Sequence, residues 1–226
     1  MSQTATHEVR CTCGAIVSVF CADSINAERH PHMRDAILAR TLHVFRCEAC
    51  QAQLAVDKPL LYIDLERRQL YGVHPPALRA HARAHAEELV EVFERTLGER
   101  GGTAARAAFG GGDFHVRVCY GNEELREKLV AHDAGLRDLP LEALKAELLA
   151  GTPALREAGV IALHLDRVET AELVFLAERA TSPPALLDRA VTAPRASYEA
   201  LAAVPWPELL ARFPGIASGP HVSMLR

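Results

Sequence analysis

The sequence lacks a long apolar run, an apolar leader and an excess of basic residues. No stretch reaches the about 18 consecutive apolar residues that a transmembrane helix needs, so we expect no membrane span. The first ten residues contain no apolar segment of the kind found in secretory signals, which favours a cytoplasmic protein. Lysine is also scarce, because only three of the 25 basic residues are lysines.

The charge distribution argues against nucleic acid as a partner. The formal net charge is −4. Residues 1–75 carry eight acidic and eight basic side chains, which leaves 21 acidic and 17 basic ones for the rest of the chain. Non-specific affinity for nucleic acid comes mostly from a basic excess, and neither part has one.

Length and composition are those of a globular protein. The chain has 226 residues, of which 49% are hydrophobic and 24% charged, and this excludes a disordered or fibrous protein. At about 150 residues per domain, one composite domain or two small ones are expected. We predict an α+β fold with a first domain at 8–133 and a C-terminal α+β region at 134–226, packed either separately or with the first domain as one unit.

Hydrophobic periodicity and turn residues outline the elements. Strands are predicted at 15–20, 42–46, 53–56, 60–65, 69–73 and 114–120, and a later hairpin at 160–165 and 171–177. Helices are predicted at 30–39, 77–97, 122–135, 141–150, 195–203 and 207–213, with a loop at 101–112. The short first helix is thus inserted between two β-hairpins, and a small antiparallel sheet follows near the C-terminus.

Five of the six cysteines lie within the first 50 residues. In a chain without an export signal, clustered cysteine pairs indicate metal ligands before disulfides. Cys11 and Cys13 form one pair, Cys47 and Cys50 the other, and each pair lies where one predicted strand ends and the next begins. Two hairpin tips that each present two thiolates to one ion form a zinc ribbon, whose closed tetrahedral site is structural.

The first pair has a one-residue gap, whereas the second has the usual two. Alternate residues of an extended segment project to the same face, so a modest bend brings both sulfurs towards one metal. Gly14 permits a positive φ directly after Cys13. Cys21 and His7 are the alternative ligands; we interpret Cys21 as a small buried hydrophobe and place His7 in a frayed terminus.

No other group of residues forms a catalytic set. His81 and His85 share a helical face near His74, but this helix lacks the glutamate of a metalloprotease motif, and a solvated face is expected. His115 and Cys119 share a strand face about 13 Å apart, too far for a nucleophilic pair. The glycines at 110–112 lack the lysine of a phosphate-binding loop.

The N-terminal part resembles the bacterial CpXC family. The resemblance rests on both cysteine pairs, on Ser24-Ile25-Asn26, on the LHVFRC segment at 42–47 and on the PLLYID segment at 59–64. It is close over residues 9–75 and looser through 114–132 and the C-terminal tail. The family's first CPxC is shortened here to Cys11-Thr12-Cys13, and the second pair lacks its proline. The resemblance implies a zinc-ribbon protein and supplies no catalytic residues.

Three functions follow as hypotheses. We favour a non-enzymatic protein whose structural zinc is held by Cys11, Cys13, Cys47 and Cys50 and whose partner is another protein. The first alternative is a transcription-associated or nucleic-acid-binding ribbon, which the charge count disfavours. The second is an enzyme with a site in the C-terminal part; its candidate residues are His115, Arg117, Cys119 and His164.

Overall fold

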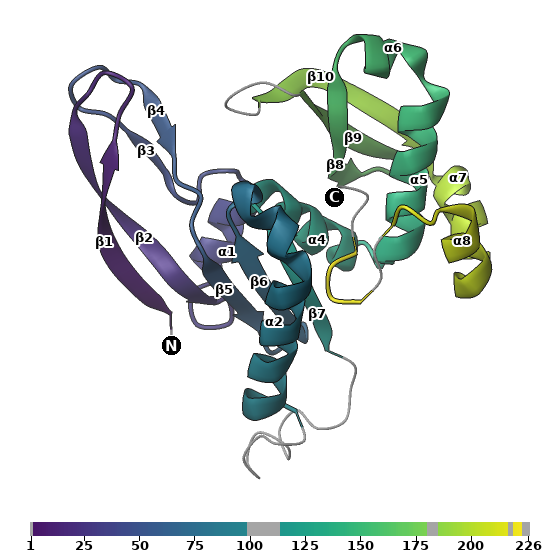
Figure 1. Cartoon of the computed structure of the whole chain (residues 1–226), viewed down its shortest axis with the longest axis horizontal. Helices are drawn as coiled ribbons and strands as arrows, with labels where there is room; N and C mark the ends of the chain where they lie inside the picture. The colour runs from purple at the N-terminus through teal and green to yellow at the C-terminus, as the bar shows by residue number, and fades with distance from the viewer. Residues whose placement is uncertain (1, 99–113, 180–184, 217–218, 223–226) are drawn as a thin grey trace. The chain divides into compact units, whose positions relative to one another are not determined.

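The computed structural model describes residues 2–98, 114–179, 185–216 and 219–222 (Figure 1). Its internal contacts divide the chain into two units, Met1–Leu125 and Arg126–Arg226. This division falls inside helix α4 (Asn122–Asp133), and the boundary predicted at 133/134 stays a prediction. The predicted glycine-rich loop at 101–112, with its glycines at 110–112, lies outside the described residues.

The first unit is built on a mixed five-stranded sheet in the order β1-β2-β5-β6-β7. Strands β1 and β2 are antiparallel, β2 and β5 parallel, β5 and β6 antiparallel, and β6 and β7 parallel. Each parallel pair requires a crossover connection, and helical segments lie in both of them. The strands are β1 (Gln3–Arg10), β2 (Ile16–Asn26), β5 (Leu60–Asp64), β6 (Gln69–His74) and β7 (His115–Tyr120).

A second hairpin, separate from this sheet, is inserted in the first crossover. It consists of β3 (Val44–Arg46) and β4 (Gln53–Ala55), and it follows helix α1 (Pro31–Leu38). Pro31 opens α1 at a position where the missing N–H costs no helical hydrogen bond. The prediction of a short helix between two hairpins is therefore confirmed.

The helix predicted at 77–97 divides into two segments. The 3₁₀-helix η1 (Pro76–His81) leads into α2 (Ala82–Thr96). Figure 1 shows α2 lying along one face of the sheet, and Leu89 packs there against Leu70, Val118 and Tyr120.

The expected frayed N-terminus is wrong, because residues 3–10 form β1. This strand pairs along its whole length with β2, so His7 lies opposite Val19. The segment escaped prediction because it is an edge strand whose residues are exposed or half-buried and mostly polar, so it has little apolar alternation. Strand β2 also continues beyond its predicted end, to Asn26.

The second unit combines a three-stranded antiparallel sheet with helices. The sheet has the order β10-β9-β8 and contains the predicted hairpin plus one strand that was not predicted, β10. The core includes Leu141, Leu165, Leu173, Phe175 and Leu209, all fully buried. The elements are α5 (Asp138–Gly151), α6 (Pro153–Glu157), β8 (Val160–Val168), β9 (Glu172–Arg179), β10 (Ala185–Pro194), α7 (Arg195–Ala202) and α8 (Trp206–Arg212). None of the helices in the described ranges is long and apolar enough to span a membrane.

Candidate metal centre

The first cysteine pair occupies the tight turn between β1 and β2. The Cys11 N–H donates to the Ala15 carbonyl at 2.8 Å, and the Gly14 N–H donates to the Cys11 carbonyl at 2.9 Å. Gly14 has a φ of 91°, as its place after Cys13 predicted. The predicted extended backbone is wrong, however. The two cysteines lie in a hydrogen-bonded turn, and the turn itself directs both side chains.

The second pair occupies an analogous turn between β3 and β4. The Cys47 N–H donates to the Ala52 carbonyl at 2.9 Å, and the Gln51 N–H donates to the Cys47 carbonyl at 2.8 Å. Gln51 has a φ of 62° and therefore takes the left-handed conformation that Gly14 takes in the first turn. Both turns thus have a residue with a positive φ directly after the second cysteine, although one residue separates the two cysteines in the first hairpin and two residues separate them in the second.

The two turns bring their four sulfurs together. All four Sγ atoms, of Cys11, Cys13, Cys47 and Cys50, lie within 4.8 Å of one another. The Cys11–Cys50 distance is 3.5 Å and the Cys13–Cys47 distance is 3.8 Å, so each of these contacts joins one hairpin to the other. A disulfide needs about 2.05 Å between sulfurs, and all six cysteines are free thiols. The cluster is close enough to hold a metal ion.

Burial differs in the same way within both pairs. The first cysteine of each turn is buried, with 2% of Cys11 and none of Cys47 exposed. The second cysteine, Cys13 or Cys50, lies at the surface. Each turn therefore has one sulfur anchored inward and one facing outward.

The two alternative ligands lie outside this cluster. Cys21 is fully buried within β2, as expected of a small hydrophobic residue. His7 lies on β1, where its Nε2 atom is 3.8 Å from the Asp23 carboxylate.

The neighbouring thiols shift one another's pKa values. The backbone N–H of Cys13 favours the Cys11 thiolate and, together with the other cysteines and against desolvation, lowers the pKa of Cys11 to about 6. At Cys50 the backbone of Ala52 lowers the pKa, but Cys11, Cys13 and burial outweigh it and raise the pKa to about 12. Adjacent anions disfavour one another, so four simultaneous thiolates require a cation among them.

The histidines singled out from the sequence form a different arrangement. The rings of His81 and His85 are 6.2 Å apart, whereas those of His74 and His85 stack at 3.7 Å with an angle of 4°. The His85 Nδ1 atom is 2.9 Å from the Tyr120 hydroxyl. This stack could not be predicted from residue spacing, because His74 lies at the end of β6 and His85 lies on α2, which packs against that strand.

The residues considered for an enzyme site are divided between the two units. His115, Arg117 and Cys119 lie on β7 in the first unit, and His115 Nδ1 is 2.8 Å from the Tyr71 hydroxyl. His164 lies on β8 in the second unit, where its Nε2 is 2.7 Å from a Glu178 carboxylate oxygen. Each histidine therefore has its own partner within its unit.

Comparison with known proteins identified one family. The sequence family described as CpXC protein matches residues 9–145 of this chain. The match covers more than half of the chain and includes all four clustered cysteines. Searches of curated proteins and of solved structures found no match.

Proposed function

The chain belongs to the CpXC family, and we propose that its four clustered cysteines hold one structural Zn²⁺ ion. The observation that carries this proposal is the convergence of four sulfurs from two separate hairpins. Thiolates in a four-sulfur set favour zinc or an iron–sulfur centre, and a single tetrahedral ion with two pairs of cysteines is the common structural zinc site.

The sulfur spacing fits a single tetrahedral ion. With Zn–S bonds of about 2.3 Å, the edge of the tetrahedron is about 3.8 Å. The separations of 3.5 and 3.8 Å between the hairpins agree with that edge. Bound zinc supplies two positive charges, which allow all four sulfurs to be thiolates at neutral pH.

The hairpin formed by β3 and β4 needs such a link. Its strands have three residues each, and an isolated two-stranded hairpin is at best marginally stable in water. Cys47 and Cys50 join its tip to the longer β1–β2 hairpin, which continues into the main sheet. The role of the ion is thus to hold the ribbon together, and the reduced thiols suit a cytoplasmic protein.

Native mass spectrometry with elemental analysis tests this proposal. We expect one zinc per chain, lost in Cys13→Ser because three thiolates bind much more weakly. Cys21→Ser is the control, because Cys21 lies outside the cluster, and it should keep the full metal content. Iron in place of zinc, or zinc retained in Cys13→Ser, would contradict the proposed site.

We further propose that the ribbon is a non-enzymatic module that binds another protein. Ile16 and Phe20 are 61% and 64% exposed, and their spacing along β2 puts both side chains on the same face. Within the described part of the chain, neighbouring β1 is the edge strand of its sheet and can accept an added strand from a partner. Apolar side chains beside a free edge support a protein partner better than a nucleic-acid one.

A photo-crosslinking amino acid at Ser18, which lies between Ile16 and Phe20, tests this surface. We expect one discrete protein to be crosslinked and the additional change Phe20→Ser to abolish the product, because the apolar anchor is lost. Zinc content should stay unchanged in that variant, which separates binding from folding. Failure to crosslink a discrete protein, or a product that persists in Phe20→Ser, would count against this role.

A further inference from the structure

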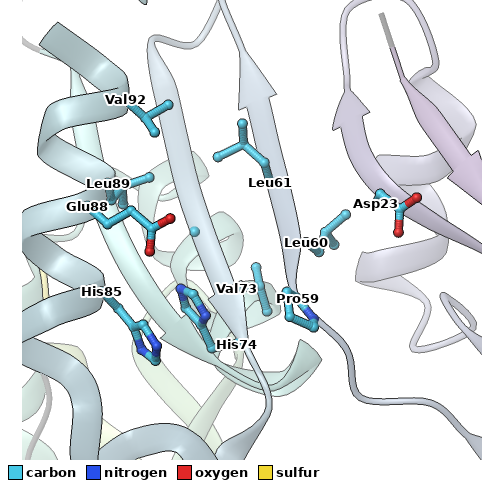
Figure 2. A pocket seen from close by; sticks show the side chains of 11 residues that line it. Asp23, Pro59, Leu60, Leu61, Val73, His74, His85, Glu88, Leu89 and Val92 are labelled. Carbon is cyan, nitrogen blue, oxygen red and sulfur yellow. The ribbon is translucent and has the colours of Figure 1, made fainter. Parts of the chain in front are cut away.

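A pocket lies between helix α2 and strands β5 and β6, away from the cysteines (Figure 2). Its volume is about 380 Å³, within the range of small-molecule sites, which is about 300–1,000 Å³. It is lined by Asp23, Pro59, Leu60, Leu61, Gly72, Val73, His74, His85, Glu88, Leu89 and Val92. All of them belong to the first unit.

One part of the pocket is apolar. Figure 2 shows Leu61 on the strand side opposite Leu89 and Val92 on the helix. Gly72 also lines the pocket, and a Cβ there would meet the Leu89 side chain at 3.3 Å. The missing side chain thus lets Leu89 lie close to the sheet, and the apolar lining of this part of the pocket suits an alkyl or aryl group.

The other part carries the stacked imidazoles of His74 and His85. Burial lowers the pKa of His74, proximity to His85 lowers it further, and Glu88 opposes this. The stacked ring of His85 and the burial both favour the neutral form of His74. Neutral imidazole offers one ring nitrogen as a hydrogen-bond acceptor.

The charge of the pocket comes from Glu88. Figure 2 shows its carboxylate between the apolar side chains and the two histidines. The second acidic lining residue, Asp23, is neutralised by its ion pair with Lys58. Among the described residues that line the pocket, no lysine or arginine is present.

We propose that this pocket binds a small organic amine with an apolar body. The ammonium group would lie beside the Glu88 carboxylate, within reach of the His74 ring, and the apolar body would contact Leu61, Leu89 and Val92. Charge complementarity selects a cation, because the pocket provides the Glu88 carboxylate and no lysine or arginine among its described lining residues. This inference does not depend on the zinc site.

Titration of the full-length protein with hexylamine at pH 7.5, followed by NMR amide shifts, tests the proposal. Hexanol and hexanoate serve as matched probes with the same chain and a neutral or anionic head group. We expect saturable shifts in α2 and β6 and affinities in the order amine, alcohol, carboxylate. Hexanoate that binds as tightly as hexylamine, or no saturable shifts in these elements, would overturn the proposal.

Two variants and one control test which residues of the pocket bind the probes. Glu88→Gln should weaken hexylamine about threefold without changing hexanol, since a partly solvated ion pair contributes little to affinity. Glu87→Gln is the control, because Glu87 pairs with Arg83 on the same helix and does not line the pocket. Val92→Trp should fill the apolar part and abolish binding of both probes. Equal losses in both glutamine variants would overturn the assignment of Glu88.

Discussion

Replacing Cys47 by serine is expected to unfold the ribbon and to release the zinc ion that we propose it holds. Cys47 is fully buried and anchors the β3–β4 turn, so its loss removes one ligand and the inward end of that hairpin. Structural zinc contributes about 10–16 kcal/mol in small metal domains, more than the roughly 5–15 kcal/mol of a typical net stability. We therefore predict that the first unit of the Cys47→Ser protein is unfolded or aggregated.

Thermal melting by circular dichroism, with zinc content measured on the same sample, checks this result. Cys21→Ser is the matched control, because Cys21 is equally buried but lies outside the sulfur cluster. It should keep its zinc and lose much less stability than Cys47→Ser. A chelator added to the parent protein should reproduce the Cys47→Ser result. Unchanged melting together with unchanged zinc in Cys47→Ser would remove Cys47 from the site.

The elements around the cysteines could be predicted because their signals are local. Cysteine spacing, apolar alternation and Pro31 are each visible within a few residues, and they identified the two hairpins and the helix between them. The convergence of the two turns was predictable as well, because two closely spaced cysteine pairs at strand ends indicate a shared metal site before disulfides. The conformation of the second turn could not be predicted. Gln51 adopts a positive φ there, which only a glycine at that position would have indicated.

Features that depend on tertiary structure escaped prediction. Strand β1 is held by pairing with β2 rather than by an apolar pattern of its own. Strand β10 has Asp188 and Arg189 in its middle, next to a register irregularity that breaks the alternation. The pocket lining comes from three strands, the segment before β5 and one helix. Its histidines stack only because α2 crosses β6, which no spacing in the sequence encodes.

The burial of three charged helix residues in the second unit is also invisible in the sequence. In the sequence, Glu127, Glu142 and Lys145 resemble an ordinary solvated helix face, yet they are 1%, 1% and 6% exposed. The Lys145 ammonium donates to Glu127 at 2.8 Å and to Glu142 at 2.7 Å. The other Glu127 oxygen accepts the Leu165 N–H at 2.6 Å, which ties α4 to β8.

Burial and the two lysines act in opposite directions on the pKa values of these carboxyls. Burial alone would raise the pKa of Glu127, but Lys145 and Lys128 outweigh it and lower the pKa to about 2. For Glu142, burial raises the pKa despite the same two lysines. Lys145 thus forms an ion pair with both carboxyl groups. Without it, Lys128 would be the cation left to compensate the negative charge of Glu127, Glu142 and Asp138.

Lys145→Met is expected to destabilise the second unit by about 3–5 kcal/mol at pH 7, the usual cost of leaving a buried charge without its partner. In the parent, the lowered pKa of Glu127 contributes stability above about pH 4.5 that is lost as the pH falls towards 2. In the variant, burial raises the pKa of both carboxyls above their unfolded values. Protonation on acidification then relieves the buried charge, so the difference from the parent should shrink.

Urea unfolding of parent and variant at pH 7 and pH 5 measures that difference. Arg212→Met is the control, because Arg212 is a largely exposed cation of the same unit that pairs with Glu147 at 2.5 Å. A surface pair contributes only about 0–1 kcal/mol, so the control should lose little at either pH. Equal losses in both variants, or a Lys145→Met deficit that is the same at both pH values, would show that the buried carboxylates do not depend on Lys145. A larger loss that narrows at pH 5 would mean that this lysine compensates the buried charge of these carboxyls and keeps Glu127 ionised inside the core.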